Sequence, residues 1–134
     1  MEHYELAQDI KVYCVRSESF PEGVLTAHQE LHKLVPYSSD RKYFGLSRPK
    51  MGIINYSAAA EELHEGELSS LKLQDHIIPK GKYHSITIHN FMEDISAIGK
   101  AFEQLVSMPD IDPDGYCVEW YLSDKDVRCM VKIR

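Results

Sequence analysis

The sequence lacks the features that mark membrane, secreted or nucleic-acid-binding proteins. No apolar run approaches the roughly 20 residues of a membrane-spanning helix, and the acidic start, Met1 to Glu5, has no apolar stretch to make a signal peptide. The three cysteines lack metal-ligand spacing, which is typical of free thiols in a reducing cytoplasm. A formal net charge of −6 would repel a phosphate backbone. We therefore expect a cytoplasmic protein that contacts neither membrane nor nucleic acid.

Cofactor and metal motifs are missing as well. The sequence has no phosphate-binding loop, haem motif or zinc cluster, so we predict no cofactor and no metal. His28 and His32 have the i, i+4 spacing of metal ligands, but Gln29 stands where a zinc protease has glutamate. His28 and His32 are therefore expected to be packed or surface histidines. His89 is expected to have a structural role. The negative charge instead favours a cationic ligand or a basic protein partner.

What is present indicates one globular domain, residues 1–134, with 43% apolar residues. Alternating and helical patterns predict the order strand, helix, strand, strand, repeated once. The predicted strands are 10–16, 41–46, 51–58, 82–89, 115–122 and 127–133. The predicted helices follow capping-box segments at 19–22 and 90–93. A turn is expected at 47–50 and a connector at 61–74.

The two units, about 8–60 and 77–134, lack clear residue identity, but their shared element order predicts the architecture. We expect an α+β fold: a tandem β-α-β-β repeat that forms an antiparallel sheet, with two helices on one face and a ligand groove on the other.

The strand at 115–122 is unusual because a carboxylate interrupts an apolar segment. Alternation places Trp120 on one face, where core packing is favoured, and Glu119 with Tyr121 on the other. Burying an unpaired charge is costly. Glu119 is therefore solvated at an edge, paired with a basic side chain, or positioned for a cationic ligand. The groove is expected to bring together Glu119, Tyr121, Tyr83 and Thr87, with Tyr56 as a neighbour.

Two short segments, IPKGKY at 78–83 and VEWY at 118–121, flank the second predicted helix. They resemble the GyrI-like effector-binding domain, which occurs C-terminal to the DNA-binding modules of AraC-type and MerR-type regulators and also as single-domain proteins. The resemblance covers nearly the whole chain and is strongest over 77–122.

The resemblance implies a groove in which aromatic residues and a buried glutamate bind lipophilic cations. By position, Glu119 matches the ligand carboxylate, Tyr121 its strand partner and Tyr83 the tyrosine after the Pro-Gly turn, while Tyr56 and Phe44 are looser matches. The chain shows no DNA-binding module, so transcriptional control by this polypeptide alone is not expected.

The favoured function is that of a bacterial multidrug-binding protein without catalysis, which sequesters amphiphilic aromatic cations or senses them for a separate regulator. Two alternatives stay open. A GyrI-like hydrolase of reactive small molecules would use Glu119 as general acid or base. A protein-binding inhibitor of the DNA gyrase type would use the acidic surface against a basic partner.

Overall fold

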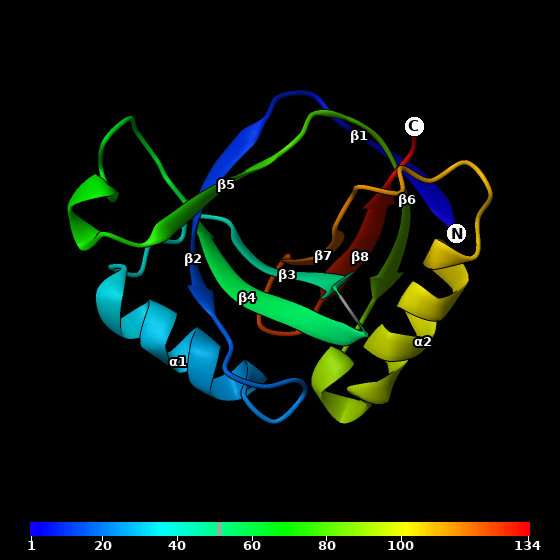
Figure 1. Ribbon diagram of the computed structural model, residues 1–134, viewed down its shortest axis with the longest axis horizontal. Coiled ribbons are helices and arrows are strands. Elements are labelled where there is room, and N and C mark those ends of the chain that lie inside the picture. The colour runs from blue at the N-terminus through cyan, green and yellow to red at the C-terminus, as the bar shows by residue number, and fades with distance from the viewer. Residues whose placement is uncertain (51) are drawn as a thin grey trace.

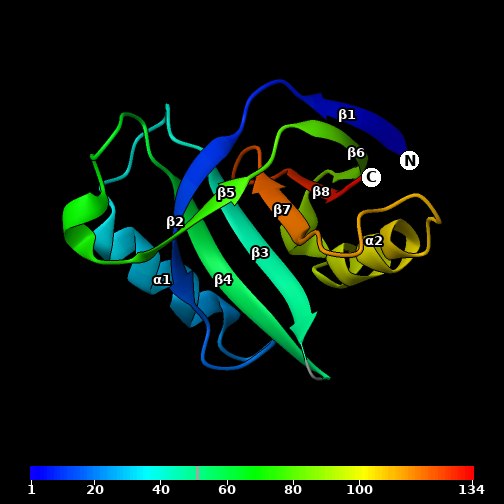
Figure 2. The same cartoon turned by 45° about the horizontal axis from the view of Figure 1, so that its top comes forward.

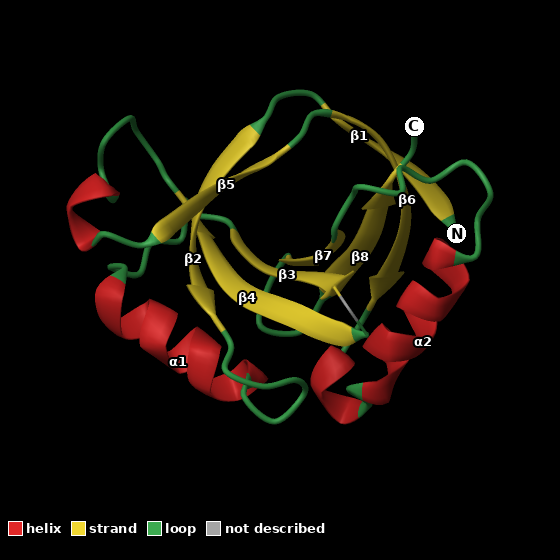
Figure 3. Ribbon diagram, viewed as in Figure 1, coloured by secondary structure: helices red, strands yellow, loops and turns green. Residues whose placement is uncertain are grey.

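The computed structural model describes residues 1–50 and 52–134, and it contains an antiparallel sheet with two α-helices (Figure 1; Figure 3). The strands are β1 (Glu2–Leu6), β2 (Ile10–Arg16), β3 (Tyr43–Lys50), β4 (Ile53–Glu61), β5 (Gln74–Ile78), β6 (Gly81–Ile88), β7 (Cys117–Tyr121) and β8 (Val127–Lys132). The helices are α1 (Val24–Leu34) and α2 (Ser96–Val106), with single 3₁₀ turns η1 (Ser69–Leu71) and η2 (Phe91–Glu93). The predicted α+β class is confirmed. Neither helix of the described chain is long and apolar enough to cross a membrane.

The eight strands form one sheet in the order β1-β6-β8-β7-β3-β4-β2-β5. The sheet curls into a half-barrel, so that its edge strands β1 and β5 approach each other on the side away from the helices (Figure 1; Figure 2). The units β2-α1-β3-β4 and β6-α2-β7-β8 join where β3 pairs with β7. Each edge strand pairs with the unit that is farther from it in the sequence. β1, which precedes the first unit, pairs with β6 of the second, and β5, which precedes the second unit, pairs with β2 of the first.

The edge strands β1 and β5 were not predicted. Both show the same burial pattern, in which only the last residue, Leu6 or Ile78, is fully buried. A strand with one buried side chain lacks the apolar alternation that identifies strands in a sequence. Pairing with β6 and β2 therefore specifies these two strands more than their own residues do.

Two apolar layers cover the two faces of the sheet. The inner layer fills the curl and includes Val12, Phe44, Val118, Trp120 and Met130. Trp120 packs edge-to-face on Tyr4 at 5.6 Å and lies 5.7 Å from Phe44, which confirms its predicted core position. On the outer face, α1 buries Ala27 and Leu31 against β2 and β4, and α2 buries Ala101 and Leu105 against β8. Both helices thus lie on one face, as predicted.

Both helices start later than their predicted capping segments. α1 begins at Val24 after Gly23, and α2 begins at Ser96 after Ile95, in each case without a side-chain cap. Residues 19–22 form a turn whose backbone carbonyls accept the bonds from Gly23 and Val24. Asn90 adopts the left-handed conformation (φ 54°) and precedes η2. A capping residue needs an extended backbone, so the predicted role of Asn90 is wrong.

The predicted turn at 47–50 is also wrong. β3 continues through Lys50 and pairs with β4, which starts at Ile53, so residues 47–50 belong to a strand. Met51, the predicted start of the next strand, lies outside the described residues. Pro49 is tolerated because β7 pairs with β3 only as far as Ser47, so the missing N–H of the proline costs no bond to β7.

The segment between β4 and β5, predicted as a connector, is held to the sheet by Arg41. The Arg41 side chain is 2% exposed and donates to both carboxylate oxygens of Glu67 at 2.8 Å. It also donates to the carbonyl oxygen of Glu61 at 2.6 Å. The bonds from Arg41 lower the pKa of Glu67 to about 2.

We predict that Glu67→Gln lowers the free energy of unfolding by about 2–3 kcal/mol, because it leaves a buried guanidinium without its counter-charge. The control Glu30→Gln breaks the exposed pair with Lys33 and should change the free energy of unfolding by less than about 0.5 kcal/mol. A depressed carboxylate pKa stabilises the fold above its unfolded value of 4.5, and this contribution is lost as the pH falls towards 2. Urea denaturation between pH 7 and pH 2 measures both effects. Equal stability of the two variants at pH 7 would contradict the prediction.

Candidate functional site

Glu119 is a buried carboxylate on a central strand. Glu119 is 8% exposed, and its strand, β7, lies between β8 and β3. Its Oε1 accepts hydrogen bonds from the hydroxyls of Tyr121 at 2.5 Å and Tyr56 at 3.1 Å. Within the described chain it forms no ion pair with a basic side chain. Of the three states considered from the sequence, a solvated edge residue and an ion-paired residue are therefore both wrong.

The bonds around Glu119 extend to helix α1. The hydroxyls of Tyr56 and Tyr121 lie 3.3 Å apart, and His28 Nε2 lies 2.8 Å from the Tyr56 hydroxyl. The His28 ring also packs edge-on against both tyrosines, at 5.8 Å and 5.4 Å between ring centroids. Side chains from α1, β4 and β7 thus form one connected polar cluster beneath the helices.

A glycine makes room for this cluster. Gly45 of β3 pairs directly with Glu119 of β7. A Cβ atom at Gly45 would stand 2.0 Å from the Tyr56 hydroxyl oxygen and 2.7 Å from Glu119 Oε1. The missing side chain therefore lets the tyrosine reach across β3 to the carboxylate.

Two phenylalanines complete an aromatic wall. Phe20, in the turn before α1, lies 5.8 Å from the Tyr56 ring and is 40% exposed. Phe91, in η2, lies 5.7 Å from the Tyr121 ring. These rings come from both units of the fold, so the wall spans the join between them.

Burial sets the charge states of the cluster. It raises the pKa of Glu119, an effect that the hydrogen bonds from Tyr121 and Tyr56 partly offset. Burial, with a smaller contribution from His32, lowers the pKa of His28 to about 4. Burial and the nearby carboxyl raise the pKa of Tyr56 and of Tyr121. At neutral pH the histidine and both tyrosines are uncharged, so nothing in the cluster neutralises an ionised Glu119.

Only part of the predicted residue set comes together. Glu119, Tyr121 and Tyr56 are in direct contact. The expectation that Tyr83 and Thr87 share their face is wrong: Cys129 pairs with Glu119 and Ile86 pairs with Cys129, so β6 presents its even-numbered residues to this face.

The three displaced residues face the curl. The Tyr83 hydroxyl donates to the carbonyl oxygen of Pro79 at 2.5 Å, and Phe44 packs in the inner core. Thr87 pairs with Arg128, which is the partner of Trp120. The carboxylate therefore lies on the helix face, rather than in a groove on the opposite face. Strand alternation does not reveal how β6 and β7 are registered, which is why the prediction failed.

Sequence reasoning missed four residues of the site: His28 of the polar cluster, Gly45 beside it, and Phe20 and Phe91 of the aromatic wall. His28 did carry a usable signal, because it falls in the apolar stripe of its helix with Val24 and Leu31 and therefore faces the sheet. Gly45 gave none, since its role depends on a tyrosine from the next strand.

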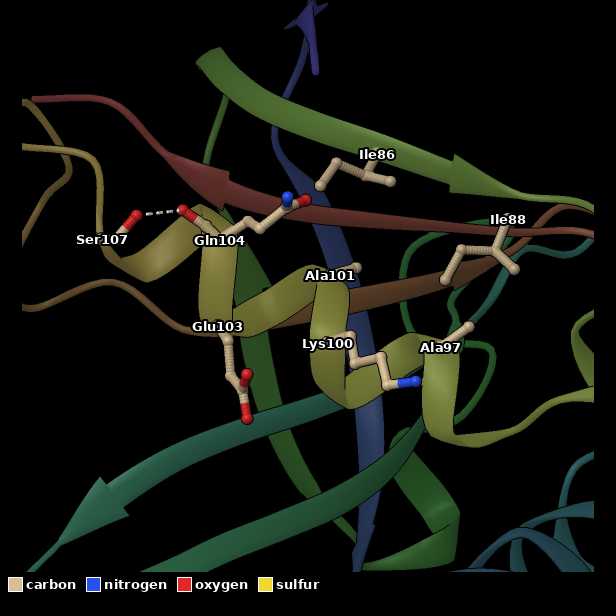
Figure 4. A pocket seen from close by; sticks show the side chains of 8 residues that line it. All are labelled: Ile86, Ile88, Ala97, Lys100, Ala101, Glu103, Gln104 and Ser107. Atoms are coloured by element: carbon tan, nitrogen blue, oxygen red, sulfur yellow. Dashed lines mark hydrogen bonds between the residues drawn. The ribbon is translucent and has the colours of Figure 1, made fainter.

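Two hollows in the described chain lie away from Glu119. One, of about 630 Å³, is shallow and lies between α2 and β6, where Ile86, Ile88 and Ala101 line it (Figure 4). The other, of about 150 Å³, opens on the inner side of the sheet near Tyr83 and Tyr116. No group of three or more potential metal ligands occurs in the described residues.

We predict that Gly45→Ala destabilises the fold by about 1–3 kcal/mol, since a methyl group at this position must displace the Tyr56 hydroxyl. The cost should fall when Tyr56→Phe is added, because the nearest clashing atom is then gone. Gly99→Ala is the matched control. Nothing lies within 4 Å of its Cβ position, and alanine favours helix α2 by up to about 1 kcal/mol. Chemical denaturation of the four variants measures these differences, and an equal cost of Gly45→Ala with and without the Tyr56 hydroxyl would refute the contact.

Comparison with known proteins identifies the fold. No family model matches the chain, and no curated protein matches it significantly. Among solved structures, an integron cassette protein from the mobile metagenome of Vibrio cholerae matches with a TM-score of 0.67 at 16% identity, over 99% of this chain and 95% of that chain. A hydrolase from Listeria innocua matches with a TM-score of 0.50 at 11% identity, over 99% and 90% of the two chains. An uncharacterized conserved protein from the same organism matches with a TM-score of 0.52 at 11% identity, over 99% of this chain and 91% of that chain. The chain therefore has the half-barrel fold of these proteins.

Proposed function

We propose that this chain is a small-molecule-binding domain of the GyrI-like type, which takes a lipophilic, aromatic cation onto Glu119. The observation that carries the proposal is a buried carboxylate whose partners in the described chain are uncharged hydroxyls. A carboxylate in such surroundings gains more from an incoming cation than a solvated one does, because little water competes for it.

The second carboxylate oxygen is the natural point of contact. Oε1 carries both tyrosine bonds, whereas Oε2 accepts none within the described chain. Oε2 is also not among the fully enclosed atoms that lack a partner, which in the described chain are Arg41 Nε and His84 Nδ1. It is therefore partly accessible, and a cation that reaches it would meet an unused acceptor.

The aromatic wall suits an aromatic cation. Tyr56 and Tyr121 bond to the carboxylate, and Phe20 and Phe91 lie against their rings. Each ring face over which a cation lies contributes roughly 0.5–2 kcal/mol. Because Phe20 is 40% exposed, we place the entry at this residue, where a ligand would move one surface side chain instead of the core.

These positions define the proposed contact set. Glu119, Tyr121 and Tyr56 are kept from the sequence-based set, and His28 supports them through its bond to the Tyr56 hydroxyl. Tyr83, Thr87 and Phe44 belong to the opposite face and would not touch the same ligand. The domain would act as a sensor for a separate regulator or as a sequestering protein in the cytoplasm.

A hydrolase is the second candidate, favoured by the hydrogen bond of 2.5 Å between Tyr121 and Glu119 and by the raised pKa of that carboxyl. A raised pKa makes a carboxyl group better able to hold and deliver a proton to a leaving group, and its conjugate base can activate water. The name of the Listeria innocua neighbour, a hydrolase, agrees with this possibility. Incubation with a strained electrophile such as an epoxide would give product in the wild type and none in Glu119→Gln.

We predict that tetraphenylphosphonium raises the melting temperature of the wild type, whereas tetraphenylborate, an anion of the same shape, does not. At one hundred times the dissociation constant, binding adds about 2.7 kcal/mol, or roughly 10 °C for a domain of this size. Glu119→Gln keeps the shape and the hydrogen bonds but removes the charge, so most of the shift should disappear. The exposed Glu103→Gln should behave as the wild type. Equal shifts with cation and anion, or none with the cation, would exclude the proposed function.

A further inference from the structure

The hydrogen bonds on Glu119 continue beyond the carboxylate in a chain of three groups. Oε1 is 3.1 Å from the Tyr56 hydroxyl, which is 2.8 Å from His28 Nε2. A tyrosine hydroxyl both donates and accepts, and a neutral imidazole carries its proton on either nitrogen. Each link of this chain can therefore be made in either direction.

Both protonation states of Glu119 satisfy the same geometry. With the carboxylate ionised, His28 Nε2–H donates to the Tyr56 oxygen and the Tyr56 O–H donates to Oε1. With the carboxyl protonated, its O–H donates to the Tyr56 oxygen, the Tyr56 O–H donates to Nε2, and the ring proton lies on Nδ1. Tyr121 directs its hydroxyl at Oε1 in either state. No link of the chain is lost when the proton moves.

Each end of the chain carries an atom without a partner in the described chain. His28 is half-buried on α1, and its Nδ1 has no partner in the described chain, yet is not among the fully enclosed unpartnered atoms. It is therefore partly accessible to water. At the other end, Oε2 is the oxygen that a ligand would contact. A cation seated on Oε2 covers that side and leaves the path through Tyr56 and His28 open.

Among the described residues, no basic side chain forms an ion pair with the carboxylate. The titratable groups that face Glu119 are His28 from α1, Tyr56 from β4, Tyr121 and Cys117 from β7, and Cys129 from β8. Burial lowers the pKa of His28 to about 4 and raises that of Cys129 to about 12. All of these groups are neutral at neutral pH, so the charge at the site depends on Glu119 alone.

We propose that cation binding at this site is an exchange, in which the cation arrives at Oε2 as the proton of Glu119 leaves through Tyr56 and His28. This rests on the proposed function. The O–H bond of Glu119 breaks as its proton moves to the Tyr56 oxygen. The former Tyr56 proton passes to Nε2, and the Nδ1 proton passes to water. One cation enters and one proton leaves, so the buried site stays electrically neutral.

The exchange makes affinity depend on pH in a defined sense. Below the raised pKa of Glu119 the cation must displace a proton, so apparent affinity falls by up to about tenfold per pH unit as the pH is lowered. Above that pKa the carboxylate is already ionised and affinity levels off. His28 acts as a positioning and relay residue, and it does not need to touch the ligand.

Titration calorimetry with tetraphenylphosphonium, which has no proton to lose, tests the exchange. The heat of binding is measured at one pH in phosphate and in Tris, whose ionisation heats differ, and the difference gives the number of protons released. The wild type should release up to one proton per bound cation. Glu119→Gln should bind weakly and release none. Binding without proton release would overturn the exchange and leave the proposed function standing, whereas absence of binding would overturn both.

Stopped-flow mixing with a pH indicator tests the route. His28→Gln can still donate to Tyr56 but cannot pass a proton between two ring nitrogens. It should release the same number of protons more slowly, on the order of tenfold or more. His32→Gln, one turn further along α1, is the matched control and should release protons at the wild-type rate. A purely structural role for His28 predicts wild-type rates in His28→Gln, and that result would overturn the relay.

Discussion

The burial of an unpaired carboxylate in the middle of a sheet is the constraint on which this site depends. Glu119 lies on a strand with neighbours on both sides, so water cannot solvate it as at an edge. The fold compensates with two hydroxyl donors on one oxygen. One donor, Tyr121, comes from the same strand. The other, Tyr56, reaches over β3 and does so only because Gly45 has no side chain. Strand pairing, a glycine and two tyrosines thus form a single arrangement.

That arrangement depends on how the two units of the fold join. The β3–β7 pairing places residues of the first unit beside a carboxylate of the second, and the exchanged edge strands β1 and β5 attach each unit to the other at two further places. The helices then cover the outer face from either side (Figure 1). A site built at such a join belongs to neither unit alone, which explains why its members are scattered from the first helix to the seventh strand.

Local features of the sequence predicted much of this fold. Apolar alternation located six of the strands, and the repeated order of elements placed both helices correctly on one face. The relation between Glu119, Tyr121 and Trp120 also followed from alternation within one strand. What failed required information from other strands. The face of Tyr83 depends on the register between β6, β8 and β7, and β1 and β5 exist through their partners. The first capping segment was misread because backbone carbonyls of Ser19 and Pro21 accept the bonds expected of a serine side chain, and the second because Asn90 is left-handed. His28 was recognisable as sheet-facing, but only the position of Tyr56 shows what it bonds.

The position of Trp120 has an optical consequence. It is the single tryptophan of the chain and the next residue after Glu119, yet alternation places it in the inner core with Tyr4 and Phe44. Its emission therefore reports on the interior of the half-barrel, whereas the near-ultraviolet signals of Tyr56 and Tyr121 arise beside the carboxylate. Because Tyr4 and Tyr83 lie in the inner layer, the tyrosine signals arise on both faces of the sheet, whereas the emission of Trp120 reports on the inner face alone.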